Sequence, residues 1–427
     1  MVTIMLLKEY KNIAEKVYSQ KLPNGLSVFV VPKPGFQKRY AFFATDYGGA
    51  DRKFKLGGKW TQTPEGVAHF LEHKLFDTPD GGNALTTLSA NGASPNAYTS
   101  TDITAYHFEC IEKFDENLET LLSFVSTPYF TPESVEKEQG IIAQEIKMVE
   151  DDPDYCLYYG FMKSLFHHNP MRDSVAGTVE SISEITADTL YDCHKVFYNP
   201  SNMVLCVVGD VDPSKVIDMA LKVLPKHAGE IPERDYGSPE VLSPCAKGFY
   251  KDMEVSLPIF LAGCKIIPPI HGPQYLRHSL INSLALDLLV GHSSPLFIKL
   301  YSQGLINSDF SASFDCAVGA AYVLFGGEAR EPKRVFEEVQ TEIARLSKSG
   351  LDAQLFRRTK KAALGATIRA FNSFETTCGN IVEGHFRGFD PFDAPEVLSG
   401  ISQDDILDFY RTSLLSDNMA ISIVAPH

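Results

Sequence analysis

The chain has 427 residues, of which 44% are hydrophobic and 22% charged, a composition typical of a soluble globular protein of two or three domains. The formal net charge is −15 and no block of lysine or arginine occurs, so nucleic acid is not expected as a partner. No stretch approaches about 18 consecutive apolar residues, so we expect neither a membrane-spanning helix nor a membrane partner.

The predicted elements, taken in chain order, mix strands and helices without a regular βαβ alternation. In the first half, strands are predicted at 26–31, 40–45, 104–110 and 204–209, and helices at 66–75, 114–125, 132–150 and 187–197. In the second half, strands are predicted at 258–266, 321–325 and 420–424, and helices at 280–290, 334–347 and 353–371. This order indicates an α+β fold in which a sheet covered by helices is made twice.

The chain repeats itself weakly, with a constant separation between matching residues. Ile185 corresponds to Ile401, and the segment that begins at Asn202 corresponds to the segment that begins at Asn418, each 216 positions further along. We interpret this offset as an internal duplication. We therefore expect one domain at residues 1–225, a linker rich in proline, glycine and charge at 226–245, and a second domain at 246–427.

The N-terminus and the cysteines both favour a cytoplasmic location. The apolar run within residues 1–8 lacks a basic segment before it and small residues for cleavage after it, unlike a signal peptide. The eight cysteines are scattered without a C-x-x-C pair, and several lie in apolar runs. Reduced, buried thiols are the expected result.

Residues 69–73 read H-x-x-E-H, the pattern of the inverted zinc-protease motif. On a helix, His69 and His73 project from one face, so both imidazoles could bind one metal ion. Glu72 would lie near the metal without binding it, free to take a proton from an activated water. Solvated residues on a surface helix would give the same letters, but the apolar neighbours on both sides predict a mostly buried helix. We interpret the motif as a zinc site for one ion per chain.

A third metal ligand should come from another apolar helix, since catalytic zinc usually has three protein ligands. The best candidates are Glu138 and Glu145, which are seven residues apart and so share a face of the predicted helix 132–150. From this spacing alone, two solvated glutamates on an amphipathic helix are the simpler interpretation.

Residues 22 to about 215 resemble the M16 metallopeptidases, a family that includes pitrilysin, insulin-degrading enzyme and mitochondrial processing peptidase. The residues that carry the resemblance are the 69–73 motif, Asn96-Ala97-Tyr98-Thr99-Ser100, and Glu138-x₆-Glu145. The sequence around these residues is most similar to that of the short bacterial M16B branch with its YmfH-like members. The second half is similar to the degenerate repeat of the family.

The resemblance implies a LuxS/MPP-like metallohydrolase fold with mostly antiparallel sheets, and it implies a role for each matching residue. His69, His73 and Glu145 would be the zinc ligands, Glu72 the general base, and Glu138 a carboxylate that orients the site. Asn96 and Ala97 would lie on an edge strand that receives the substrate. Without the resemblance, residues 91–96 are simply a good turn before a strand.

The implied activity is that of a zinc-dependent endopeptidase acting on unfolded peptides or small proteins inside a two-part chamber. A maturation protease for one dedicated peptide would share this chemistry. The alternative from another class is a non-catalytic scaffold or assembly subunit. The intact motif residues favour the enzyme, because family members of the scaffold kind generally lose them.

The second half departs from the family pattern in two places. It has no H-x-x-E-H, and the lone His292 near the equivalent position is expected to be structural. Many members also carry an arginine and a tyrosine seven residues apart, where this chain has Tyr301 and, one position short, Asn307. The resulting hypothesis is a dimer, possibly a heterodimer in which a metal-free M16 partner supplies the Arg/Tyr pair.

Overall fold

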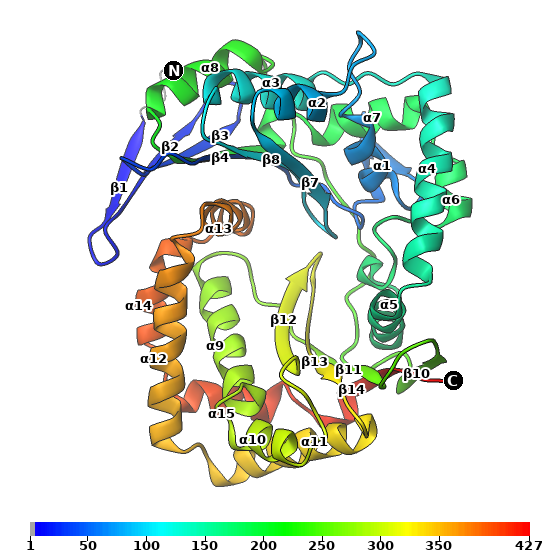
Figure 1. Ribbon diagram of the computed structural model, residues 1–427, viewed down its shortest axis with the longest axis vertical. Helices are drawn as coiled ribbons and strands as arrows, with labels where there is room; N and C mark the ends of the chain where they lie inside the picture. The colour runs from blue at the N-terminus through cyan, green and yellow to red at the C-terminus, as the bar shows by residue number, and fades with distance from the viewer. Residues whose placement is uncertain (1–4) are drawn as a thin grey trace. The chain divides into compact units, whose positions relative to one another are not determined.

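The computed structural model describes residues 5–427, so the first four residues of the apolar N-terminal run lie outside the described range. The chain forms two compact units, neither of them contiguous in sequence (Figure 1). Unit 1 comprises Met1–Ile146, Ser174–Tyr236 and Arg369–Phe386. Unit 2 comprises Lys147–Asp173, Gly237–Ile368 and Arg387–His427. The domain bounds of the sequence analysis, which follow the duplication, stay a prediction.

Unit 1 is built on a seven-stranded sheet that is antiparallel except between its third and fourth strands. In spatial order the strands are β1 (Leu6–Tyr10), β2 (Glu15–Lys21), β3 (Ser27–Pro32), β9 (Met203–Gly209), β4 (Arg39–Thr45), β8 (Thr104–Cys110) and β7 (Ser94–Thr99). A separate hairpin consists of β5 (Lys53–Leu56) and β6 (Lys59–Gln62). Within the described residues β7 pairs with β8 alone, so it is an edge strand.

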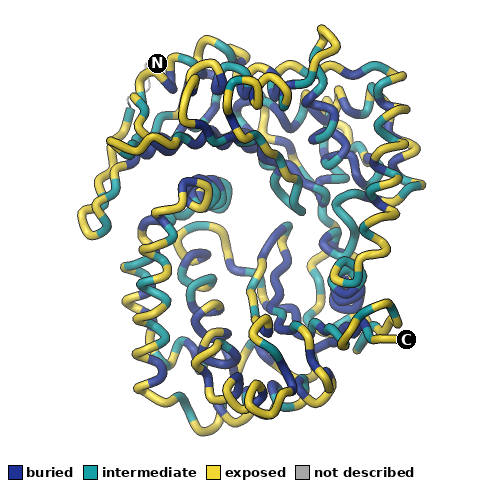
Figure 2. Tube along the Cα trace, viewed as in Figure 1, coloured by how far each residue is buried: buried dark blue, intermediate teal, exposed yellow. Residues whose placement is uncertain are grey.

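Most helices of unit 1 lie on one side of this sheet, packed on it or on one another, and they bury its apolar side chains there (Figure 1). They are α1 (Val67–Lys74), α2 (Ala84–Ala90), α3 (Phe114–Ser126), α4 (Pro132–Glu150), α6 (Val179–Ser183), α7 (Ala187–Phe197) and α8 (Pro213–Val223). The central strand β9 is buried along its whole length, and Figure 2 shows buried residues concentrated in the inner strands and the helix faces against them.

Unit 2 is built on a five-stranded sheet in which only the first pair of strands is parallel. Its strands are β10 (Gly248–Asp252), β14 (Met419–Ala425), β11 (Ile259–Ile266), β13 (Ala320–Glu328) and β12 (Ser311–Ala317). Its helices include α9 (Pro273–Val290), α10 (Pro295–Ser302), α11 (Pro332–Ser349), α12 (Ala353–Ala370), α14 (Ala394–Ser399) and α15 (Gln403–Thr412). Short 3₁₀ turns occur in the chain at Pro170–Arg172, Pro200–Asn202, Pro391–Asp393 and Ser416–Asn418.

The two sheets repeat one topology, as the constant offset in sequence suggests. The order β3-β9-β4-β8-β7 in unit 1 matches β10-β14-β11-β13-β12 in unit 2, with the same strand directions. The register repeats too, because Thr45 faces Met203 in one sheet and Cys264 faces Met419 in the other. The mixed α/β architecture with mostly antiparallel sheets therefore confirms the predicted fold class.

Each half of the sequence gives one helix to the unit that is built mainly from the other half. Helix α13 (Phe374–Arg387) covers the second face of the unit 1 sheet, where Cys378 Sγ lies 3.7 Å from the Cys206 carbonyl oxygen. Helix α5 (Pro153–Leu165) covers the second face of the unit 2 sheet, where a separate apolar cluster includes Phe161 and Tyr322. No periodicity in the sequence predicted this exchange.

One helical stretch, Pro273–Ser302, is long and apolar enough to cross a membrane by length and composition alone. However, 61% of its most apolar window is buried inside the protein. Buried core helices of soluble proteins pass the same test, so this helix is weak evidence for a membrane span.

Candidate metal centre

Helix α1 carries the H-x-x-E-H residues, and its start depends on a glycine. Gly66 has φ +91°, and a Cβ there would lie 2.6 Å from the Ala176 carbonyl oxygen, so a side chain would be strained and would clash. Val67, Phe70 and Leu71 are buried in the unit 1 core. The core packing of these residues fixes the helix, and helical spacing then places the two histidines on one face.

His69, His73 and Glu145 come together at a single point between α1 and α4. His69 Nε2 lies 3.6 Å from Glu145 Oε1, and His73 Nε2 lies 3.6 Å from Glu145 Oε2. The ligand atoms of all three residues lie within 4.8 Å of one another. Within residues 5–427 this is the one group of histidine, cysteine or acidic side chains that could hold a metal ion.

Glu138 contacts the site from the turns of α4 that precede Glu145. Its Oε1 lies 3.1 Å from His73 Nδ1 and its side chain is only 15% exposed. A carboxylate can only accept, so Nδ1 of His73 donates and Nε2 remains free for a metal ion. Glu138 therefore fixes both the tautomer and the ring orientation of His73.

The charges of the site suit a divalent cation. Burial and the neighbouring His73 lower the pKa of His69 to about 4, so its imidazole is neutral at physiological pH. Burial also lowers the pKa of His73, but its hydrogen bond to Glu138 and the nearby carboxylates outweigh burial, and the pKa is raised overall. Two imidazole nitrogens with a carboxylate form a ligand set that zinc accepts.

Nδ1 of His69 is buried and has no hydrogen-bond partner among the residues that the structure describes, so no contact orients this ring as Glu138 orients the ring of His73. The fit to zinc rests on the donor set, which is two imidazole nitrogens and one carboxylate oxygen within 4.8 Å of one another. The residues present therefore fit a zinc ion held by His69, His73 and Glu145.

Glu72 makes a different contact from the three clustered residues. Its side chain is almost completely buried, and its Oε2 accepts a hydrogen bond of 2.6 Å from Thr99 Oγ1. Burial raises the pKa of Glu72, whereas this hydrogen bond lowers it. Thr99 belongs to the 96–100 segment but had no predicted role. The available signal was a hydroxyl residue two positions after Ala97 on the strand expected to receive the substrate.

Asn96 and Ala97 lie on β7, as expected, and their side chains alternate. Asn96 is exposed, while Ala97 is partly buried against the core of unit 1. The Asn96 Oδ1 atom accepts a hydrogen bond from the Ala97 amide at 2.9 Å. The structure thus places both residues on an edge strand, and their role toward a substrate stays a prediction.

Residues singled out in the second half do not form a metal site. The ring of His292 lies 4.6 Å from that of Phe297, which suits a structural role. Tyr301 is 55% exposed at the end of α10, and Asn307 donates a hydrogen bond to Glu328. The expected arginine and tyrosine are therefore replaced by an exposed phenol and an amide engaged elsewhere in unit 2.

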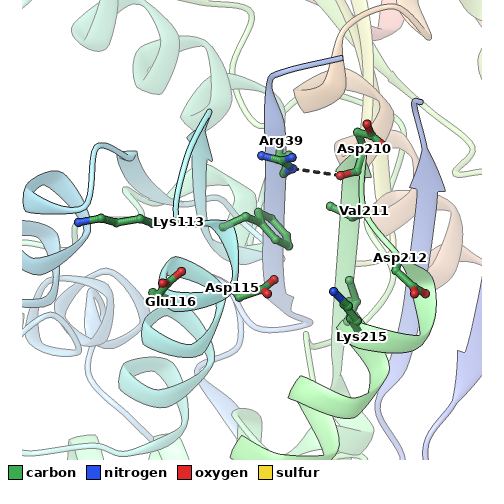
Figure 3. A pocket seen from close by; sticks show the side chains of 10 residues that line it. Arg39, Lys113, Asp115, Glu116, Asp210, Val211, Asp212 and Lys215 are labelled. Carbon is green, nitrogen blue, oxygen red and sulfur yellow. Dashed lines mark hydrogen bonds between the residues drawn. The ribbon is translucent and has the colours of Figure 1, made fainter. Parts of the chain in front are cut away.

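A hollow of about 440 Å³ lies elsewhere in unit 1, where the first turns of α3 and α8 approach each other. Figure 3 shows side chains of both signs around it, with Arg39 donating to the Asp210 carbonyl oxygen at 3.0 Å. It includes none of the metal-site residues, so it is separate from the candidate metal centre.

Comparisons with known proteins agree with this fold. Residues 58–179 match the family model described as insulinase (peptidase family M16), and residues 184–363 match the model of the peptidase M16 inactive domain. The uncharacterized zinc protease YmfH of Bacillus subtilis (strain 168) is 38% identical over 98% of both chains. An M16-like peptidase from Alicyclobacillus acidocaldarius is 34% identical, with a TM-score of 0.93 over 97% of this chain and 99% of that chain.

The repeated α+β units and the His-His-Glu cluster thus define a protein of the metallopeptidase class. The chain belongs to peptidase family M16, since relatives above 30% identity match it over nearly its full length. The subunit beta of the mitochondrial-processing peptidase of Saccharomyces cerevisiae is a more distant relative, 24% identical over 95% of this chain and 90% of its own.

Proposed function

We propose that the chain is a zinc-dependent endopeptidase that hydrolyses unfolded peptides or small proteins in the cytoplasm. The observation that carries the proposal is the convergence of His69, His73 and Glu145 beside the buried carboxylate of Glu72. The names of the related zinc proteases support it. A scaffold role is not favoured, because every residue of the motif is present and His69, His73 and Glu145 lie close to one another.

Each residue would have a distinct task. Zinc, when bound by His69, His73 and Glu145, would polarise the scissile carbonyl and acidify an attacking water. Glu138 would keep Nε2 of His73 directed at the ion. Glu72 would accept the proton of the water at Oε1 and pass it to the nitrogen of the leaving amine. Its burial, which raises its pKa, favours holding that proton between the two steps.

The substrate would enter as an extended strand. Strand β7 has an unpaired edge within the described residues, so a peptide could extend the unit 1 sheet by backbone hydrogen bonds. Backbone pairing does not read side chains, so sequence selectivity should be loose. Ala97 would then contribute main-chain contacts, because its outward amide would exchange the Asn96 oxygen for a substrate carbonyl, and Asn96 would flank them with its exposed side chain.

The proposal is tested by cleavage of a quenched, unstructured peptide with the purified, zinc-loaded chain. Glu72→Gln is the blank, because it keeps the volume and the zinc ligands but removes the base. We expect zinc binding to persist and hydrolysis to fall by about 100-fold or more. Loss of zinc from Glu72→Gln, or turnover retained in it, would contradict the assignment of roles.

We further propose that the working form is a dimer, and that a metal-free M16 chain supplies the missing Arg/Tyr pair. The motivation is the combination of a complete metal site with Tyr301 and Asn307 in the second half. A related chain that is named as a subunit gives this arrangement a precedent. If the isolated chain cleaved peptides at a rate that an Arg/Tyr-bearing partner did not increase, the heterodimer would be ruled out.

A further inference from the structure

Thr99 links the edge strand to the buried carboxylate of α1. It is the last residue of β7, on the same side of the strand as Ala97 and facing α1 rather than the exposed face of Asn96. Its Oγ1 lies 2.6 Å from Glu72 Oε2. The strand proposed to receive the peptide therefore also contacts the proposed base.

The direction of this hydrogen bond is fixed by the neighbouring groups. An ionised carboxylate only accepts, so the hydroxyl of Thr99 must donate to Glu72. Thr104, which faces Thr99 across the β7–β8 pair, donates its own proton to the Tyr47 carbonyl oxygen at 2.8 Å. Thr104 Oγ1 also lies 3.4 Å from Thr99 Oγ1, a longer contact that does not compete for the short bond to Glu72.

The backbone around Thr99 holds its hydroxyl in place. The turn that follows β7 is closed by a hydrogen bond of 2.7 Å from the Ser100 amide to the Ile103 carbonyl oxygen. The amides of Gly49 and Ala50 donate to the carbonyl oxygens of Ser100 and Thr101, both at 2.9 Å. A threonine side chain is also stiff at χ1, so few positions are open to its hydroxyl.

We infer that Thr99 is a positioning residue for Glu72. Its hydroxyl holds Oε2, which leaves Oε1 directed toward the metal centre and keeps the carboxylate from becoming a fourth protein ligand. Because Thr99 belongs to β7, a peptide pairing with that strand would stabilise the same segment that orients the base. The inference rests on the proposed function, in which Glu72 takes the proton of the attacking water.

The first test compares two substitutions at position 99 with a matched control. Thr99→Val keeps the shape and removes the donor, Thr99→Ser keeps the donor, and Thr61→Val makes the same change on β6, away from the site. With zinc content unchanged, we expect Thr99→Val to lose about tenfold or more in kcat, because placing a general base is worth about 10²–10⁴ in rate. The KM should change little, and Thr99→Ser should recover most of kcat. Equal losses in the valine and serine variants would overturn the inference.

The second test needs no turnover, so it separates this inference from the proposed function. A peptidyl hydroxamate binds zinc through its oxygens and places a proton-bearing group against the base, and its affinity can be measured by calorimetry. We expect Thr99→Val to weaken this affinity about fivefold in the native chain and to have no effect when Glu72→Ala is also present, since the two residues act as a pair. The same loss in both backgrounds would overturn the inference. A zinc-loaded native chain that binds no hydroxamate would overturn the proposed function together with it.

Discussion

Glu138 and Glu145 offer a direct test of how the metal centre is built, because they lie on one helix but have different contacts. Glu138→Gln keeps the size of the side chain and replaces a charged acceptor at 3.1 Å from His73 Nδ1 with a neutral one. Hydrogen bonds to charged groups contribute about 1.5–3 kcal/mol, roughly twice those between neutral groups. The substitution should therefore cost about 1.4 kcal/mol of zinc-binding free energy, or about tenfold in Kd.

Glu145 should matter more, because its oxygens face both imidazoles and it would bind the ion itself. We expect Glu145→Ala to weaken zinc binding at least about tenfold more than Glu138→Ala, since one of three protein ligands is lost. The assay is competition for zinc with a fluorescent chelator at neutral pH. Glu136→Gln is the control, as Glu136 is exposed on the same helix α4.

Two outcomes would refute this reasoning. If Glu138→Gln bound zinc as tightly as Glu136→Gln, the contact with His73 would not orient the ligand. If the alanine variants of Glu138 and Glu145 lost equal affinity, Glu145 would not be the third ligand.

The other predictions concern the stability of unit 2 and of helix α4. Burial raises the pKa of Glu240, but hydrogen bonds outweigh burial and lower the pKa overall, from an ordinary 4.5 to about 2. The donors are the amides of His168, Asn169 and His167 and the ammonium of Lys265. This depression corresponds to about 3 kcal/mol of stability, present above pH 4.5 and lost as the pH falls toward 2. Glu240→Gln should cost at least that much at neutral pH in urea unfolding, because it leaves the buried Lys265 ammonium unpaired; a variant as stable as the native chain would contradict the pairing. A Cβ on Gly160 would lie 2.3 Å from the Phe249 ring, so Gly160→Ala should destabilise the protein by about 1–3 kcal/mol. A Cβ on Gly140 would have no atom within 4 Å, so Gly140→Ala should instead stabilise α4 by about 0.5–1 kcal/mol in thermal unfolding. A change of stability in the same direction for both alanine variants would be inconsistent with these contacts.

Much of the fold could be predicted because its signals are local. The helices 132–150 and 187–197 and the strand 104–110 have the predicted bounds, since each has a clear period and defined ends. Helix α9 begins at Pro273, earlier than the predicted 280, because its first two turns are less apolar. The duplication was visible because Asn202 and Asn418 precede equivalent central strands, β9 and β14.

The exchange of α5 and α13 could not be predicted from these signals. Periodicity shows that a helix has an apolar face, but it does not show which sheet that face meets. Gly160 is informative only once the Phe249 ring is known to lie against it. The choice of partner sheet depends on tertiary contacts between residues far apart in the chain.

The candidate site also contains residues that local spacing predicts and contacts that it does not predict. His69, Glu72 and His73 were found from their spacing, because one helical turn fixes their relation. Glu138 and Glu145 were identified through the family resemblance, since their spacing alone also fits a solvated helix face. The link from Thr99 to Glu72 joins a strand end to a helix 27 residues earlier, and no local pattern reports such a contact.

The exchanged helices also bear on how such a chain could arise and how it can be divided. A fragment that ended at the linker would keep α5, with the apolar side chains of Phe161 and Leu165, but would lack α13 over the second face of its own sheet. Two copies of an ancestral half could each cover the second face of the other's sheet by exchanging that helix, as in a domain-swapped dimer. Gene fusion would then join the two copies into a single chain. One copy would then be free to lose its metal ligands.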